Sequence, residues 1–180
     1  MIEHYWQTVP GWFHAEDLYR RMVANAKPYD AFVEVGSWKG KSASFMAVEI
    51  ANSGKKIQFW CVDTWKGSPE LMDDPDVVAG RLHEVFLKNI EPVKEYVIDF
   101  KEESVKAASI VEGPQCDFVY IDADHSYESV KADIEAWLPK VRVGGVLAGD
   151  DRTAGGVAQA LAELLPEHEI DGLNWVWVKK

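Results

Sequence analysis

The chain has 180 residues, enough for one domain with one hydrophobic core, and 47% of them are hydrophobic. Its net charge of −11 argues against nucleic acid or an anionic membrane as the main partner. Its apolar runs are also shorter than the ~20 residues that a membrane-spanning helix needs.

The N-terminal residues and the cysteines indicate a reducing compartment. Residues 1–10 are polar and aromatic and lack the pattern of a signal peptide. Cys61 and Cys116 each lie in or beside an expected strand, which favours two buried thiols over a disulfide. We therefore expect a cytoplasmic protein. Because no repeat or change of composition divides the chain, residues 1–180 are expected to form a single domain.

Residues 1–30 are expected to form an aromatic segment and a helix that pack on this domain. The aromatic side chains within residues 1–14 suit the edge of the core or the wall of a substrate pocket. A helix over 15–26 follows, because Leu18, Met22 and Ala26 recur at helical spacing.

From residue 31 on, short apolar strands alternate with amphipathic helices. The expected strands cover 31–36, 57–62, 96–100, 117–121, 146–149, 168–170 and 174–178. Four of the expected helices cover 43–51, 104–111, 127–138 and 154–165, and Ser42 is the expected cap of the first. A further helix is expected where Val78, Leu82, Val85, Phe86 and Ile90 fall on one face. An Asp171-Gly172 turn joins the last two strands in a hairpin.

This alternation predicts an α/β fold. We expect a Rossmann-like, doubly wound sheet of seven mostly parallel strands, with helices on both faces and an antiparallel strand from the C-terminal hairpin. In such sheets the ligand binds at the carboxyl ends of the strands, where the strand order reverses. Polar residues stand at those ends, namely Glu34–Gly40, Asp63, Glu102–Ser104, Asp122–His125 and Asp150-Asp151. The site is therefore expected along one acidic edge.

The glycine turn after the first strand, residues 36–42, points the free N–H groups of the next helix at a ligand. It fails the dinucleotide pattern Gly-x-Gly-x-x-Gly at Trp38 and Lys41. It misses the phosphate-loop pattern because its glycines are one residue too close together. A third interpretation is a nucleoside without phosphates, with Asp63 accepting from the ribose hydroxyls and Glu34 favouring a cationic ligand. A phosphate-loop nucleotide enzyme and a non-catalytic cofactor-binding domain stay open as alternatives.

Four segments together resemble a known family. They are Glu-Val-Gly-Ser-Trp-Lys-Gly-Lys-Ser at 34–42, Val-Asp-Thr-Trp-Lys-Gly-Ser at 62–68, Tyr-Ile-Asp-Ala-Asp-His-Ser-Tyr-Glu at 120–128 and Val-Gly-Gly-Val-Leu-Ala-Gly-Asp-Asp at 143–151. In this order they are similar to class I S-adenosylmethionine-dependent methyltransferases, in particular to the small O-methyltransferases of the macrocin and catechol types. The resemblance covers residues 31–180 and departs from the family at Trp38, where a glycine is usual.

The resemblance implies S-adenosylmethionine as the cofactor. Gly36, Ser37 and Gly40 would hold its methionine part. Asp63 would bind the ribose, and Glu103-Ser104 would contact the adenine edge. The full expected set, in which Trp65 either covers the adenine or ribose face or packs in the core, is Glu34, Gly36, Ser37, Gly40, Asp63, Thr64, Trp65, Glu103, Ser104, Asp122 and Asp124.

Asp122 and the pair Asp150-Asp151 follow two neighbouring strands, so their carboxylates can converge on one hard cation. Oxygen ligands without thiolates favour Mg²⁺ or Mn²⁺. The resemblance implies the same three aspartates as metal ligands. In the alternative, the pair caps the next helix and no metal binds.

His125 lies three residues after Asp122, where catechol-type relatives carry the base that removes the hydroxyl proton. The expected reaction is methyl transfer from the sulfonium to the hydroxyl of a small molecule, a sugar or a phenol, with the metal lowering the pKa of that hydroxyl. Asp122 and His125 are the expected catalytic residues, and a second copy of the chain is a candidate partner in a homodimer. The remaining histidines are expected at the surface, namely His4, His14, His83 and His168.

Overall fold

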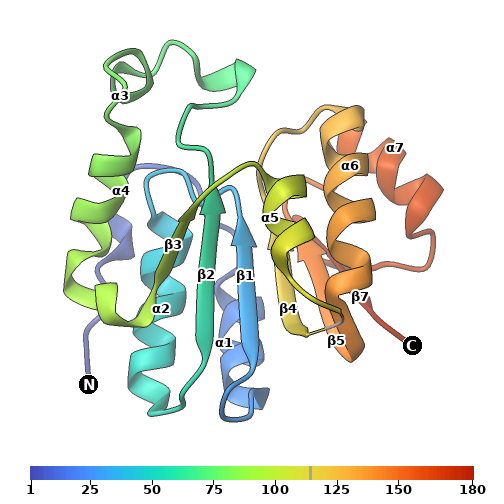
Figure 1. Ribbon diagram of the computed structural model, residues 1–180, viewed down its shortest axis with the longest axis horizontal. Coiled ribbons are helices and arrows are strands. Elements are labelled where there is room, and N and C mark those ends of the chain that lie inside the picture. Colours follow the sequence, from blue (N-terminus) through green and yellow to red (C-terminus); the bar gives the residue numbers. More distant parts are fainter. Residues whose placement is uncertain (114) are drawn as a thin grey trace.

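A computed structural model describes residues 1–113 and 115–180 of the chain. Its strands are β1 (Ala31–Val35), β2 (Gln58–Asp63), β3 (Ile98–Lys101), β4 (Cys116–Ile121), β5 (Val141–Gly149), β6 (Glu169–Asp171) and β7 (Asn174–Val178). Within the described residues they form one seven-stranded sheet in the order β3-β2-β1-β4-β5-β7-β6 (Figure 1). The strand order reverses between β1 and β4, which makes the edge above these two strands the expected ligand site.

The strands from β1 to β5 pair in parallel, and β7 runs antiparallel to both of its neighbours. The C-terminal hairpin therefore supplies the antiparallel strand, as expected. Parallel strands need crossover connections, and helices provide them along this chain. The predicted α/β fold with a doubly wound sheet is confirmed.

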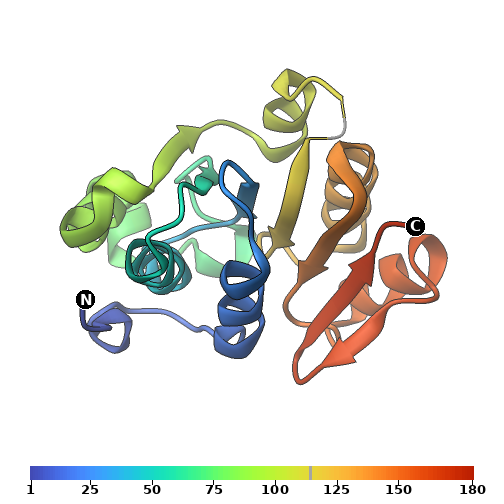
Figure 2. The same ribbon diagram turned by 90° about the horizontal axis from the view of Figure 1, so that it is seen from below.

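Helices cover both faces of the sheet (Figure 2). On one face lie α1 (Glu16–Asn25), α2 (Lys41–Ser53) and α4 (Leu82–Ile90), and on the other lie α5 (Ser104–Ile110), α6 (Tyr127–Trp137) and α7 (Gly155–Leu164). Successive side chains of β1 alternate between the two cores: Phe32 packs in the first and Val33 in the second. The shorter helical segments are α3 (Pro75–Val78), η1 (Trp6–Thr8), η2 (Pro69–Leu71), η3 (Glu91–Tyr96) and η4 (Leu138–Lys140).

The start of α2 corrects the prediction that Ser42 caps this helix. The N-cap residue is Gly40, whose φ of 85° lies in the left-handed region, and no side chain caps the helix. Ser42 lies inside the first turn, where it is buried. Glycine adopts a positive φ at little cost, so the turn itself redirects the chain into the helix.

The helix expected from Val78 to Ile90 is divided in two. Gly80 has a φ of 66° and separates α3 from α4. The first part starts with Pro75 after Asp74, whose side chain accepts a hydrogen bond from the Asp76 backbone N–H. The apolar spacing was correct for α4, but the left-handed glycine interrupts the helical backbone before it.

Two further boundaries differ from the prediction. β5 begins at Val141 rather than at Val146, since Val141 already pairs with Cys116 of β4, and the register of the pair shifts between Cys116 and Phe118. The closing hairpin turns at residues 172–173, one residue later than predicted, since Asp171 still pairs with its β7 partner.

The N-terminal segment packs on the first core, as expected. Trp6 and Phe13 contact Phe45 of α2, with ring centroids 6.0 Å and 5.2 Å away. Cys61 and Cys116 are buried free thiols, which confirms that prediction. In the part of the chain that the structure describes, no helix has the length and apolar character to cross a membrane.

Candidate active site

Two clefts open at the carboxyl ends of the central strands. The first, here called the β2 cleft, has a volume of about 380 Å³ and is lined by Asp63, Thr64, residues 102–105 and part of α6. The second, the β5 cleft, has a volume of about 450 Å³ and is lined by His125, Asp150-Asp151 and part of the N-terminal segment. They share the walls made by Gly36, Trp38, Ser68, Leu71, Asp122 and Ala123. In Figure 1 the segment after β2 rises above this edge of the sheet.

The shared wall depends on Gly36. This residue follows β1 with a φ of 90°, and a Cβ built on it would lie 2.1 Å from the backbone oxygen of Asp122. Only glycine therefore allows the end of β1 to lie against the end of β4. Gly40 has a different role, because a Cβ there would press on the ring of Phe86 at 3.0 Å, and it lines neither cleft.

The Asp63 carboxylate fastens the glycine turn to the end of β2. One oxygen accepts a hydrogen bond from the Trp38 backbone N–H at 2.8 Å, and the other accepts from the Trp65 N–H at 2.7 Å. Burial raises the pKa of this carboxyl. Each carboxylate oxygen has a second lone pair, so Asp63 can still accept from a ligand in the β2 cleft.

The same contacts weigh against the phosphate-loop alternative. The Trp38 N–H, which an anion would need, already donates to a carboxylate. Lys41, the residue that would reach the phosphates, instead donates to the Val9 carbonyl at 2.9 Å and lies 5.4 Å from the Trp6 ring centroid. This turn therefore presents negative rather than positive charge to its ligand.

Glu34 lies beneath the turn and is 1% exposed, so it lines neither cleft. Its carboxylate accepts a hydrogen bond from the Tyr19 hydroxyl at 2.8 Å. Burial raises the pKa of Glu34 to about 7. Its second oxygen and the Ser37 hydroxyl are buried without a hydrogen-bond partner among the described residues. Ser37 lines the β5 cleft, whereas Glu34 lies behind the turn.

Trp65 lies in the core rather than along the clefts. It is 4% exposed, stacks on His83 with centroids 4.2 Å apart, and contacts Phe86. Its indole N–H donates to the Trp38 carbonyl at 3.0 Å. Of the two alternatives for Trp65, packing in the core is therefore the one observed. Its backbone is left-handed (φ 50°) and its side chain points inward.

At the far side of the β2 cleft, Ser104 begins α5 directly after β3, and Glu103 is its N-cap. The Ser104 hydroxyl accepts a hydrogen bond from the Trp137 indole N–H at 2.9 Å. Asp124 also lines this cleft, and its carboxylate accepts from the Ser126 N–H at 2.7 Å. The expected residues of the adenine and ribose regions thus share one cavity.

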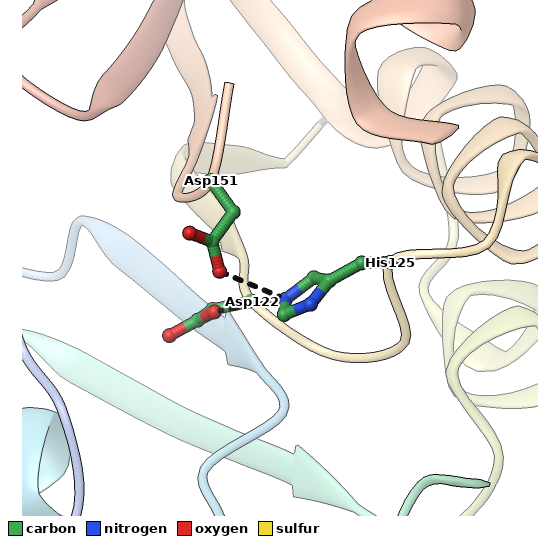
Figure 3. Close-up of side chains that lie close together, drawn as sticks. All are labelled: Asp122, His125 and Asp151. Atoms are coloured by element: carbon green, nitrogen blue, oxygen red, sulfur yellow. Dashed lines mark ion pairs between the residues drawn. The ribbon is translucent and has the colours of Figure 1, made fainter. Parts of the chain in front are cut away.

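Asp122, His125 and Asp151 form a compact group at the shared wall (Figure 3). Their ligand atoms lie within 4.8 Å of one another. The His125 Nε2 is 3.2 Å from Asp151 and 3.8 Å from Asp122, and its Nδ1 is 3.5 Å from Glu70. The neighbouring carboxylates, Asp122 first, raise the pKa of His125 to about 9, while burial raises that of Asp122. In this arrangement the imidazole carries a proton at neutral pH.

Asp150 lies near this group but is not among its close ligand atoms. Its carboxylate lies 3.2 Å from His14 Nδ1, and its other oxygen accepts from the Asp151 N–H at 2.8 Å. The structure therefore brings two of the three expected metal ligands together, with His125 in the third position. The aspartate pair does not cap the next helix, because Ala154 is the N-cap of α7 and no side chain of the described residues caps it. Binding of a cation stays a prediction.

The sequence did not indicate that two residues, His14 and Asp133, line the clefts. His14 is exposed, as expected, and it also lines the β5 cleft beside the exposed Trp12. Its partner Asp150 is 136 residues away in the sequence, so no local pattern indicated the contact. Asp133 lines the β2 cleft from α6. A buried aspartate among the apolar positions of that helix was the available signal.

Comparison with known families decides which family this site belongs to. A family model described as "Methyltransferase domain" matches residues 33–152, a span that contains the glycine turn, Asp63, Asp122, His125 and Asp150-Asp151. This chain belongs to that methyltransferase family. The resemblance to class I methyltransferases is confirmed.

The methyltransferase chain is also similar to the uncharacterised protein y4gI of Sinorhizobium fredii (strain NBRC 101917 / NGR234). The two are 29% identical over 140 residues, which are 73% of this chain and 14% of that protein. The match therefore spans a small part of the relative's length.

Solved methyltransferases share its fold. The O-methyltransferase NovP is 21% identical with a TM-score of 0.66, over 92% of this chain and 79% of that chain. CalS11, a TDP-rhamnose 3'-O-methyltransferase of calicheamicin biosynthesis, is 17% identical with a TM-score of 0.62, over 91% and 76%. Aeropyrum pernix fibrillarin, solved with S-adenosyl-L-methionine, is 16% identical with a TM-score of 0.57, over 83% and 66%.

Proposed function

We propose that this methyltransferase transfers the methyl group of S-adenosylmethionine to a hydroxyl of a small molecule. The observation that carries the proposal is the pair of clefts that meet at Gly36 and Asp122. A methyl donor in one cleft and an acceptor in the other would face each other where the two clefts meet. Alignment of two bound reactants is the main contribution a protein makes to such a transfer.

The β2 cleft suits the cofactor. Asp63 and Thr64 line the region proposed for the ribose, and Glu103-Ser104 the region proposed for the adenine. The buried Glu34 carboxyl lies beneath the turn beside which the cationic sulfonium would bind. This arrangement supports a cationic nucleoside rather than a polyphosphate, because the turn is already occupied by carboxylate charge.

The β5 cleft suits the acceptor. Its walls combine the exposed indole of Trp12 with polar groups from His14, His125 and Asp151. An aromatic face beside hydrogen-bonding groups is typical of sites for sugars and phenols. NovP and CalS11 are named as O-methyltransferases, and CalS11 as acting on a TDP-sugar, which supports a hydroxyl of this class as the acceptor.

A divalent cation fits the group of Asp122, Asp151 and His125. The carboxylate oxygens of Asp122 and Asp151 suit Mg²⁺ or Mn²⁺. The proposed cation is held by the two carboxylates, which leaves the His125 imidazole to act as the base. When bound, such a cation would supply a Lewis acid that lowers the pKa of the acceptor hydroxyl. That Asp150 also binds the cation stays a prediction.

The protein's own residues provide the proton chemistry. The role of His125 as base requires its neutral form, which its carboxylate neighbours disfavour. Asp122 and Asp151 hold the ring toward the shared wall, so the imidazole is in place once it has lost its proton. In the proposed reaction the His125 nitrogen then takes the acceptor's hydroxyl proton.

Calorimetric titration with S-adenosylhomocysteine tests the cofactor, with ATP plus Mg²⁺ as the comparison ligand. We expect S-adenosylhomocysteine to bind and ATP not to bind. Absence of binding at millimolar S-adenosylhomocysteine would contradict the proposal, and ATP binding would favour the phosphate-loop alternative. Transfer of a labelled methyl group to nucleotide-sugars and catechols, with Mg²⁺ or with a chelator, then tests the acceptor and the metal. The homodimer, the cytoplasmic location and the single-domain organisation stay predictions.

A further inference from the structure

Asp133 is a buried acidic residue in the wall of the β2 cleft. It lies on α6 and is 6% exposed, and Ser129 and Ala132 of the same helix line the cleft beside it. Burial raises the pKa of Asp133 to about 6. An acidic group in such a place destabilises the empty protein, so a hydrogen-bond donor that enters the cleft would find a strong acceptor.

Trp137 and Ser104 stand beside this carboxyl. The Trp137 indole can only donate, and it donates to the Ser104 hydroxyl oxygen at 2.9 Å. The Ser104 proton is then available for Asp133, and the nearby hydroxyl lowers the pKa that burial raises. The carboxylate keeps acceptor positions for a ligand.

The place of Asp133 matches the base of a nucleoside. Gly36 and Asp122 mark the wall shared with the β5 cleft, and Asp63 ends the next strand outward. Ser104 follows β3, one strand further from the shared wall. A nucleoside with its ribose at Asp63 and its sulfur at the shared wall would place its base near Ser104 and Asp133.

We propose that Asp133 recognises the 6-amino group of the cofactor's adenine by accepting a hydrogen bond from it. The inference rests on the proposed use of S-adenosylmethionine in this cleft. An ionised carboxylate only accepts hydrogen bonds, so it favours a 6-amino group over a 6-oxo group, whose oxygen it would repel. Trp137 and Ser104 act as positioning residues, since they stand beside the carboxyl.

The test compares S-adenosylhomocysteine with S-inosylhomocysteine, in which a 6-oxo group replaces the 6-amino group. Calorimetry gives the ratio of their dissociation constants for the wild type, Asp133→Asn and Glu135→Gln. Glu135 is the matched control, because it carries the same charge on the exposed side of the same helix. For the wild type and Glu135→Gln, we expect about tenfold to 100-fold preference for the adenosyl compound.

In Asp133→Asn the new amide can donate to a 6-oxo group, so the preference should fall below about threefold or invert. A ratio within one variant is insensitive to a general loss of stability, which circular dichroism would report separately. A folded Asp133→Asn protein that keeps the wild-type ratio would overturn the inference while leaving the proposed function intact. If neither compound binds the wild type, the proposed cofactor fails together with the inference.

Discussion

The walls of the β2 cleft come largely from residues directly after strands β1, β2, β3 and β4, whereas the β5 cleft also needs the distant N-terminal segment. Asp63 and Ser104 stand where their strand ends, so backbone direction alone places them. His14 reaches Asp150 across 136 residues of sequence. The first cleft is thus built by local chain geometry and the second by tertiary contacts. This difference suits a common donor on one side and a family-specific acceptor on the other.

Gly36→Ala should have the largest effect, because Gly36 belongs to both clefts. The new Cβ would lie 2.1 Å from the Asp122 backbone oxygen, at a φ of +90° that side chains rarely adopt. We expect the free energy of unfolding to fall by about 3 kcal/mol or more, and S-adenosylhomocysteine binding to be lost. Urea unfolding and calorimetry measure the two effects.

Gly54→Ala is its matched control. Gly54 also has a positive φ, +66°, but no atom of the described residues lies within 4 Å of a Cβ there. This variant should lose only about 1 kcal/mol of stability and should bind S-adenosylhomocysteine normally. Equal losses in the two variants would show that backbone strain, rather than the contact between β1 and β4, explains the need for Gly36.

His125→Asn should separate the two clefts. The rate of methyl transfer is expected to fall about 10²-fold to 10⁴-fold because a base is lost, while the affinity for S-adenosylhomocysteine changes less than about threefold. His168→Asn, which alters a histidine outside both clefts, should leave both quantities unchanged. A parallel loss of cofactor affinity in His125→Asn would argue against the proposed division of labour.

The same histidine predicts the pH dependence of the rate. Its pKa of about 9 means that a base at this position is neutral only at high pH. Without added metal, the rate should therefore rise as pH rises through about 9. Added Mg²⁺ should move this rise to lower pH, since positive charge among the carboxylates disfavours the protonated imidazole. A pH-independent rate in both conditions would exclude His125 as the base.

Glu34→Gln should trade stability against cofactor affinity. The pKa of about 7 in the folded protein lies above the ordinary value of 4.5, so the wild type loses stability as pH rises through 7. The variant lacks this loss, and at pH 8 its free energy of unfolding should be higher by up to about 3 kcal/mol. The gain should vanish near pH 4, while S-adenosylhomocysteine binding weakens. Thermal unfolding across pH checks the first part, and a pH-independent difference would contradict it.

His14→Ala should have the smallest effect, confined to the β5 cleft. Loss of the contact with Asp150 and of one polar wall group should raise the KM for the acceptor by about tenfold. The affinity for S-adenosylhomocysteine should stay unchanged. Steady-state kinetics with the acceptor, paired with calorimetry, measure both. An effect on the cofactor of equal size would remove the contrast between the clefts.

Much of this protein followed from its sequence. Alternating strands and helices determined the sheet, because a parallel strand needs a covering crossover helix and thus a repeating apolar pattern. Gly36, Asp63 and Asp122 could be placed at one edge because the carboxyl ends of parallel strands meet there. For these residues, the direction of the backbone was sufficient information.

The tertiary structure alone decided which way the side chains point and what they meet. Asp150 and Asp151 are neighbours in sequence, yet one faces His14 and the other His125, because the backbone of Asp151 is left-handed (φ 52°). Trp65 entered the core although it follows Asp63 by two residues. Asp133 met Ser104 only because α5 and α6 pack together. Such contacts join residues far apart in the chain, and local periodicity carries no information about them.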